Sequence, residues 1–272
     1  FTPLRAKLFI GSSSKAKPAV AAVLADKCNP DGIFLQHLIF RRTKASSEKI
    51  EFEIDHYDIH RVSYKKALST PGVWQANFMG GGRLINVIDR ANQSNNLKEF
   101  LKIKRKEEGW YFGEGWQECP DSKPISRINE LLSKDNNTAS DKKELNELQA
   151  KHSADWITGK NYIDKNGNIK GCNISFFQWP RKKKLFEPPH LIIHESANKG
   201  KIPVFFHTDY LTFRDSYFGI HAPKEDIEIL LRIKDYLSDN ANVGLIWLIS
   251  GKVITFREGV PLMSDILSLP YP

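Results

Sequence analysis

The first part of the chain is dominated by short apolar runs with strand-like alternation. Residues 32–41 contain the run GIFLQHLIF, which predicts a strand. Between residues 50 and 60, apolar and polar side chains alternate, so the two kinds would lie on opposite faces of a strand. We therefore expect residues 1–62 to be mostly strand.

The middle of the chain, residues 63–165, has sparser apolar residues, and these recur at helical spacing. A polar stretch, residues 133–140, separates the last two of the expected helices. Asp141 stands where the N-cap of the last helix is expected. The expected helices lie near residues 84–88, 97–101, 126–132 and 141–152.

Short strands return in the last part of the chain, together with one clear helix. Residues 161–171 carry an Asn-Gly turn between apolar runs, which is a hairpin pattern. Residues 225–237 have an apolar stripe at helical spacing, and residues 243–250 (VGLIWLIS) fit either a buried strand or a short helix. The expected strands are 173–177, 191–194, 202–206 and 218–221. The pattern as a whole predicts a mixed α/β protein.

Composition narrows the class of protein only a little. The 272 residues include 40 Lys and Arg against 32 Asp and Glu, a net charge of +8, which favours a polyanionic partner. No apolar run approaches the roughly 20 residues of a membrane span, so we expect no membrane contact. Three scattered cysteines suit a reducing compartment, and we expect a cytoplasmic protein. Because the chain begins at Phe1, we expect it to be a piece of a longer polypeptide.

Basic residues gather in one stretch, residues 165–201, where eight Lys and Arg stand against two acidic residues. Its centre is the run WPRKKK at 179–184, with further aromatic residues on both sides. Such a stretch can follow a phosphate backbone and offer a ring to a base. A solvated loop explains the same run equally well.

Other candidate chemistry is weaker. His56, Asp58 and His60 would share one face of a strand and present metal ligands, although a polar strand edge explains them better. Residues 111–115 (YFGEG) have the glycine spacing of an S-adenosylmethionine loop but lack the flanking strand and helix. The glycines of 80–83 (GGGR) would bring backbone N–H groups to a phosphate or form a tight turn.

Five short blocks carry a family resemblance. They are WQANFMGGGRL at 74–84, GWYFGEG at 109–115, EPPHLIIHE at 187–195, FRDSYFGI at 213–220 and DILSLPYP at 265–272. Together they resemble the region that follows the catalytic domain in the adenine-specific DNA methyltransferases of type IIG restriction–modification and related phage-defence systems. The resemblance implies that residues 1–62 are the last strands of a methyltransferase fold, 63–165 a helical connector and 166–272 an α+β target-recognition domain.

The chain departs from this family at the catalytic motif. Residues 29–32 read NPDG in place of N-P-P-F/Y, and no credible cofactor loop is present. The missing motifs hold the flipped adenine and the methyl donor in the family. We therefore expect no catalytic, cofactor-binding or metal-binding residues in this chain. S-adenosylmethionine is expected only for the catalytic methyltransferase region of the same polypeptide.

The resemblance implies that this chain binds double-stranded DNA and selects the sequence to be methylated, and in some systems cut. Contacts to phosphates position the protein on the duplex, and side chains that reach base edges read the sequence. Arg214 could instead form an ion pair with Asp209 or Asp215, which competes with a role in base reading. Trp74 and Trp110 are expected in the core rather than stacked on bases. The expected phosphate contacts are Arg83, Arg181, Lys182, Lys183, Lys184 and Lys201, and the expected base readers are Gln178, Arg181 and Arg214.

Two other functions stay open. The first is a metal-dependent nuclease built on Asp31, Glu51 and Glu53, or on the His56, Asp58 and His60 set. The second is a non-catalytic interaction subunit that uses the charged helix at 141–152. It predicts a stable complex with a separate catalytic chain and no affinity for DNA.

Overall fold

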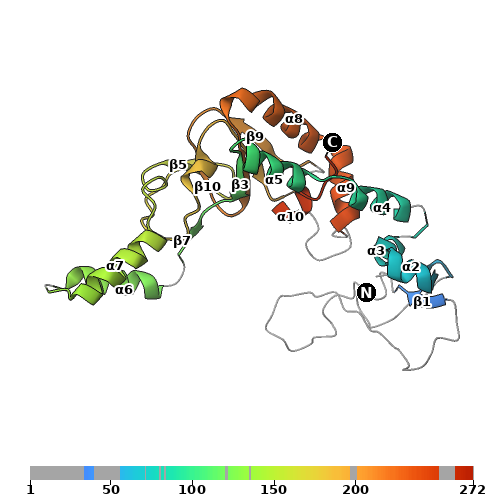
Figure 1. Cartoon of the computed structure of the whole chain (residues 1–272), viewed down its shortest axis with the longest axis horizontal. Coiled ribbons are helices and arrows are strands. Elements are labelled where there is room, and N and C mark those ends of the chain that lie inside the picture. Colours follow the sequence, from blue (N-terminus) through green and yellow to red (C-terminus); the bar gives the residue numbers. More distant parts are fainter. Residues whose placement is uncertain are drawn as a thin grey trace, which may run out of the picture. The chain divides into compact units, whose positions relative to one another are not determined.

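The computed structural model describes most of the chain after residue 33. The chain forms two compact units, residues 1–97 with 244–272 and residues 98–243. Helices and strands are mixed in both (Figure 1), which confirms the expected mixed α/β class. No helix among the described residues is long and apolar enough to cross a membrane. The described residues are 34–39, 56–70, 72–79, 81–82, 84–119, 122–134, 136–196, 201–250 and 261–271.

The first unit contains one antiparallel strand pair and several short helices. Strand β1 pairs with β2, as expected for residues 32–41, but residues 56–58 form a 3-10 helix rather than the predicted strand. Apolar side chains at helical spacing, including Ile85 and Ile88, form a small core with Val62. The elements are β1 Phe34–Leu38, η2 His56–Asp58, β2 Ile59–Ser63, α2 Tyr64–Ser69, α3 Gly72–Phe78, α4 Leu84–Gln93 and α10 Met263–Ile266.

The end of the chain packs with the first unit through backbone hydrogen bonds. The N–H of Leu97 donates to the carbonyl of Leu269 at 2.9 Å, and the N–H of Tyr271 donates to Asn95 at 2.8 Å. The ambiguous apolar run at 243–250 is helical and ends α9, Asn240–Ser250. The segments 1–62, 63–165 and 166–272 were expected from resemblance to a family, whereas the two units are defined by compactness. The three segments therefore stay a prediction.

A four-stranded antiparallel sheet lies at the centre of the second unit (Figure 1), in the order β3-β11-β8-β9. Strands β8 and β11 are the inner strands, and their side chains are almost completely buried. Helix α8 packs on β8 and β9 through the apolar stripe that the sequence predicts. The elements are β3 Tyr111–Glu114, β8 His190–His194, β9 Val204–His207, β11 Tyr217–His221, α5 Leu97–Glu107, η4 Lys224–Asp226 and α8 Ile227–Ser238.

Two smaller sheets complete this unit and join the central sheet through a shared core. The expected hairpin at 161–171 is confirmed, with Gly167 at φ 84° in its turn. Residues 173–176 are not strand; pairing begins at Phe177, whose ring packs beside Trp116 in the core. The elements are β4 Gln117–Glu118 with β7 Phe177–Trp179, and β5 Asn161–Ile163 with β6 Ile169–Gly171 and β10 Thr212–Phe213.

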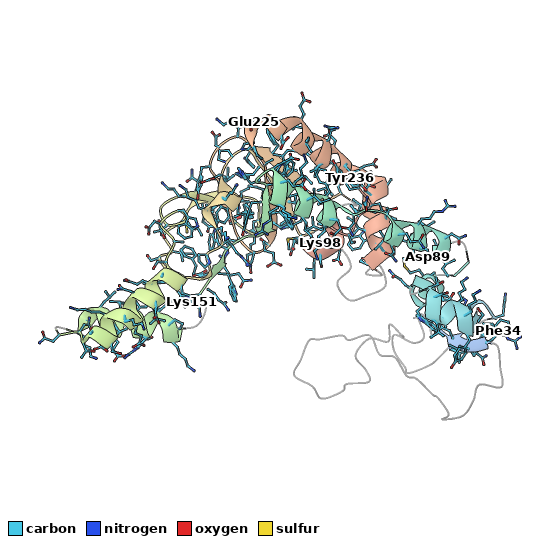
Figure 2. All side chains as sticks on the ribbon, viewed as in Figure 1. Phe34, Asp89, Lys98, Lys151, Glu225 and Tyr236 are labelled. Atoms are coloured by element: carbon cyan, nitrogen blue, oxygen red, sulfur yellow. The ribbon has the colours of Figure 1, made fainter. Side chains whose placement is uncertain are left out.

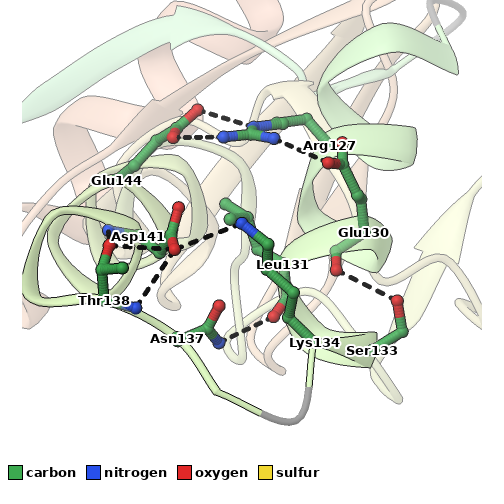
Figure 3. A network of polar contacts seen from close by, with 9 residues as sticks. All are labelled: Arg127, Glu130, Leu131, Ser133, Lys134, Asn137, Thr138, Asp141 and Glu144. Atoms are coloured by element: carbon green, nitrogen blue, oxygen red, sulfur yellow. Dashed lines mark hydrogen bonds and ion pairs between the residues drawn. The ribbon is translucent and has the colours of Figure 1, made fainter.

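Helices α6, Ser122–Ser133, and α7, Ala139–His152, form a hairpin held by polar contacts (Figures 1 and 3). The guanidinium of Arg127 donates to both carboxylate oxygens of Glu144, at 2.9 and 2.8 Å. The N-cap of α7 is Thr138, not the expected Asp141. Asp141 is instead the third residue of the helix, and its carboxylate completes a capping box by accepting the backbone N–H of Thr138 at 3.1 Å.

Candidate nucleic-acid interface

The run at 179–184, here called the basic loop, connects β7 to the short helix η3, Lys183–Phe186. Its three lysines are exposed, and the two residues after them, Leu185 and Phe186, are almost completely buried. The buried pair anchors the loop in the core, so the lysine backbones are held in place while their ammonium groups face solvent. At the other end of the loop, Trp179 leaves half of its surface exposed, 51%.

Arg181 is the fixed point of the basic loop. Its Nε donates to the carbonyl of Gly115 at 3.0 Å, and Nη2 donates to the carboxylate of Glu114 at 3.0 Å. Its φ of 65° lies in the left-handed region, which is costly for a residue with a β-carbon. These contacts stabilise the strained backbone. Arg181 therefore supports the loop in this structure, and its expected roles as a phosphate contact and base reader stay predictions.

Tyr111 on β3 brings together two cations from separate elements. The guanidinium carbon of Arg105 lies 4.5 Å from the ring centre, and Nζ of Lys182 lies 5.9 Å from it. None of the ion pairs found among the described residues involves Arg105 or Lys182. Two positive groups that share one ring repel each other, so a bound anion would stabilise the pair.

The other lysines of the basic loop differ in their surroundings. Lys183 has one distant ion pair, 3.9 Å from Glu187, between side chains that are largely exposed. Such a pair contributes little to stability and leaves the ammonium group accessible. Lys184 lies beside Gly109, where a β-carbon would come within 3.3 Å of its Nζ. The φ of 73° at position 109 favours glycine, whereas the flexible end of Lys184 could move away from a β-carbon.

Two pockets adjoin the basic loop and share Trp156 and Lys183 in their walls. The first has a volume of about 650 Å³ and the second of about 520 Å³. Both pockets have aromatic and cationic side chains in their walls. The first is lined by Asp155, Trp156, Gly159, Lys160, Asn161, Lys183 and Tyr210, and the second by Tyr111, Ala150, Trp156, Trp179, Pro180, Arg181, Lys182 and Lys183.

The remaining expected contact residues lie at several places. Gln178 is exposed on β7, next to the basic loop. Arg214 forms an ion pair with Glu118 of the neighbouring strand β4 at 3.4 Å, rather than with either aspartate considered from the sequence. Lys201 is exposed at the start of the segment that leads to β9. Arg83 lies outside the described residues, so the structure assigns it no contact.

The two tryptophans that are expected in the core differ in burial. Trp110 is buried, and its indole N–H donates to the carboxylate of Asp226 at 2.7 Å, as the core interpretation predicts. Trp74 is half-buried and its ring meets His37 edge-on, with ring centres 5.2 Å apart. Neither ring lines the two pockets described above.

Sequence reasoning missed the residues that complete this surface. Arg105, Tyr111, Trp156 and Tyr210 come from four separate segments, and none stands in the basic run. Each of the four is aromatic or basic, as residues that bind nucleic acid often are, but many such residues occur elsewhere in the chain. Only the tertiary fold brings these four to the basic loop.

The glycine-rich segment at 111–115 does not fit a methyl-donor site. A β-carbon on Gly115 would overlap the carbonyl oxygens of Arg214 and Phe213, far inside van der Waals distance. The glycine is needed because two stretches of this chain's own backbone approach each other there. Residues 111–114 are also paired with β11, so the segment is part of a sheet rather than an open cofactor loop.

The turn at 80–83 is described only in part. Gly81 and Gly82 have φ of 72° and 64°, and they lie between α3 and α4. The N–H of Gly81 donates to the carbonyl of Ala76 at 2.6 Å, which closes the end of α3. These observations favour the tight-turn interpretation of the glycines.

The metal-site alternatives find no support in the described residues. His56 and Asp58 belong to a 3-10 helix and His60 to the following strand, so the three do not alternate along one strand face. Among the described residues, no group of three or more His, Cys, Asp or Glu has the arrangement of a metal site. Asp31, Glu51 and Glu53 lie outside the described residues.

The charged helix of the interaction-subunit alternative is α7. Lys142, Lys143 and Lys151 are exposed on it, and Figure 2 marks Lys151 near its C-terminal end. Two of its three acidic residues, Asp141 and Glu144, are paired within the helical hairpin, where hydrogen bonds hold the pKa of both carboxyl groups below its usual range. The polar character of α7 is thus explained in part by the hairpin itself.

Comparisons with models of protein families, with curated proteins and with solved structures find no match to this chain. The functional argument therefore depends on the geometry and charge of the residues described above.

Proposed function

We propose that this chain recognises a sequence in double-stranded DNA and directs adenine methylation, with or without cleavage, by a larger restriction–modification polypeptide. The methyl donor, S-adenosylmethionine, would belong to the catalytic region of that polypeptide. Recognition and methylation of the DNA would take place in the cytoplasm, where bacterial DNA is found.

The observation that carries this proposal is the basic loop. Three neighbouring lysines are exposed on a backbone that Leu185, Phe186 and Arg181 hold in place. Their intramolecular ion pairing is slight, so their charge is available to an external polyanion. DNA binding gains most of its affinity from such lysine–phosphate contacts, which release counterions.

Sequence readout needs side chains beside these phosphate contacts. Gln178 is exposed on β7, directly before the basic loop, and its amide can donate and accept at an adenine edge. Arg214 contacts the neighbouring strand β4 through Glu118. A base contact by Arg214 would require the ion pair to open, whereas Gln178 needs no such change. Gln178 is therefore the stronger candidate for base reading.

Selection from randomised duplex DNA tests this proposal. The full chain is expected to enrich one defined sequence, and Gln178→Ala is expected to relax the preference at one position by roughly 5- to 150-fold, the range of one bidentate base contact. Asn146→Ala, which removes an exposed amide from α7, is the matched control and should select the same sequence as the unmodified chain. Enrichment of no sequence would contradict the proposal.

A further inference from the structure

We infer that the pocket between Trp156 and Tyr210 binds a single unstacked nucleotide, with its base against the aromatic wall and its phosphate at Lys183 and Lys160. For a nucleotide that belongs to a DNA strand, this inference rests on the proposed function. The same chemistry is present in a free mononucleotide, and the experiment below separates the two sources.

The size and wall composition of the pocket fit this ligand. A volume of about 650 Å³ lies within the range of small-molecule sites. Trp156 and Tyr210 provide aromatic surface, and base–aromatic stacking is a main source of affinity for unpaired nucleotides. The adjoining pocket adds Trp179 and Tyr111 and shares Trp156, so a neighbouring nucleotide would also meet an aromatic surface.

The pocket wall contains polar groups that can bind a phosphate and the edge of a base. Lys160 and Lys183 line the pocket and are exposed, so their ammonium groups can reach a phosphate. Asp155 and Asn161 supply an acceptor and an amide for the edge of a base. The indole N–H of Trp156 is buried and has no hydrogen-bond partner among the described residues. A buried donor without a partner is costly, so a water or ligand atom that reached this N–H would stabilise it.

The aromatic wall is held in position before any ligand arrives. The hydroxyl of Tyr210 donates to the carbonyl of Trp156 at 2.7 Å. Burial raises the pKa of Tyr210 to about 12, so the hydroxyl keeps its proton at neutral pH. The turn that carries Trp156 is closed by the N–H groups of Ile157 and Thr158, which donate to the carbonyl of Ala154 at 2.9 and 3.0 Å. The N–H of Gly159 ties the turn to the carbonyl of Cys172 at 2.7 Å. A preformed wall reduces the entropic cost of binding.

A duplex of two helical turns that contains one unpaired 2-aminopurine tests the inference, with the fully paired duplex as reference. The full chain is expected to bind the bulged duplex about tenfold more tightly, since stacking of one base has this order of effect. The 2-aminopurine emission should fall on binding because its ring stacks. Lys160→Ala and Trp156→Ala should each reduce the ratio of the two affinities from about ten to about one, whatever their effect on the paired duplex.

Two controls keep this test decisive. Lys165→Ala removes an exposed lysine from the nearby hairpin and should keep the preference. Trp156→Phe retains an aromatic wall without the indole N–H and should keep most of the emission change, which guards against misfolding of Trp156→Ala. Equal affinity for both duplexes, with unchanged emission, would overturn the inference and leave the proposed function standing.

Free dAMP separates the sources of the ligand. Binding of dAMP that Lys160→Ala weakens, together with no binding of either duplex, would support the pocket assignment and overturn the proposed function. Failure of dAMP and of both duplexes to bind would overturn the inference and the proposed function together.

Discussion

At the scale of single residues, His190 shows how burial determines the state of a side chain. Its imidazole is completely buried at the start of β8. Its Nδ1 lies 3.0 Å from the carbonyl of Glu187, which also faces Nδ1 of His221 at 2.7 Å. A carbonyl only accepts, so Nδ1 carries the proton in both rings. Nε2 of His190 is left buried and has no hydrogen-bond partner among the described residues.

This environment predicts acid sensitivity of the fold. Burial lowers the pKa of His190 to about 4, whereas the unfolded chain takes up this proton near 6.5. Between these pH values the unfolded state therefore binds more protons than the folded state. The contribution of His190 to the free energy of unfolding is fully present above pH 6.5, and about 3 kcal/mol of it is lost toward pH 4. Urea unfolding of His190→Phe across this range should give a shallower dependence on pH.

The apolar replacement suits this position because Phe213 already packs beside the His190 ring, with centres 6.5 Å apart. His207 and His221 also have pKa values lowered chiefly by burial, so the variant should keep part of the pH dependence. Identical pH profiles of the two proteins would show that His190 is not responsible.

At the scale of elements, the segment from β3 to β4 connects the central sheet to the basic loop. Gly115 lies against the backbone of residues 213–214, and its carbonyl accepts the Nε of Arg181. Gly113, two residues earlier, has room, since its β-carbon would meet only Leu185 at 4.0 Å. The two glycines of one motif therefore have different structural roles.

Alanine substitution separates these roles. Gly115→Ala should destabilise the fold by about 3 kcal/mol or more, because backbone must move to admit the methyl group. Gly113→Ala should cost about 1 kcal/mol or less, because its methyl group meets its neighbour at an ordinary van der Waals distance. Thermal unfolding of both variants measures the difference. Equal destabilisation would contradict the close approach at Gly115.

Local signals explain which elements were predictable. The hairpin at 161–171 follows from its Asn-Gly turn, and Asp164 closes it by accepting from the N–H groups of Asn166 and Asn168. The apolar run at 243–250 is equally compatible with strand and helix, so periodicity left it undecided. The N-cap of α7 was misplaced because Thr138 and Asp141 are both good capping residues. Residues 173–176 alternate but pair with none of the described strands.

The site was predictable only where it is contiguous in sequence. The lysines of the basic loop are visible as a run, and the same charges are exposed in the structure. Tyr111 and Trp156 belong to the site because β3 and the turn after α7 meet the loop in three dimensions. No local pattern indicates that meeting. Arg181 reads as a free cation in the sequence, whereas its ion pair with Glu114 exists only in the fold.

At the scale of the whole molecule, the net charge of +8 favours polyanions without saying where they bind. Exposed lysines occur on several elements of the unit of residues 98–243, including α5, and two sets of three allow a matched comparison. One is on the basic loop beside aromatic pockets, and the other is on α7. The central claim is that DNA binds to the first set. Variants with equal loss of charge distinguish this claim from general attraction to a basic protein.

Fluorescence anisotropy of the full chain with duplex DNA, between about 50 and 200 mM salt, tests this claim most directly. One variant replaces Lys182, Lys183 and Lys184 with Ala, and the matched variant replaces Lys142, Lys143 and Lys151. The first should bind weakly, with the log–log salt slope reduced by about 0.9 for each phosphate that the chain no longer neutralises, while the second keeps the slope of the unmodified chain. Equal slopes in the two variants, or no binding by the unmodified chain at low salt, would contradict the account.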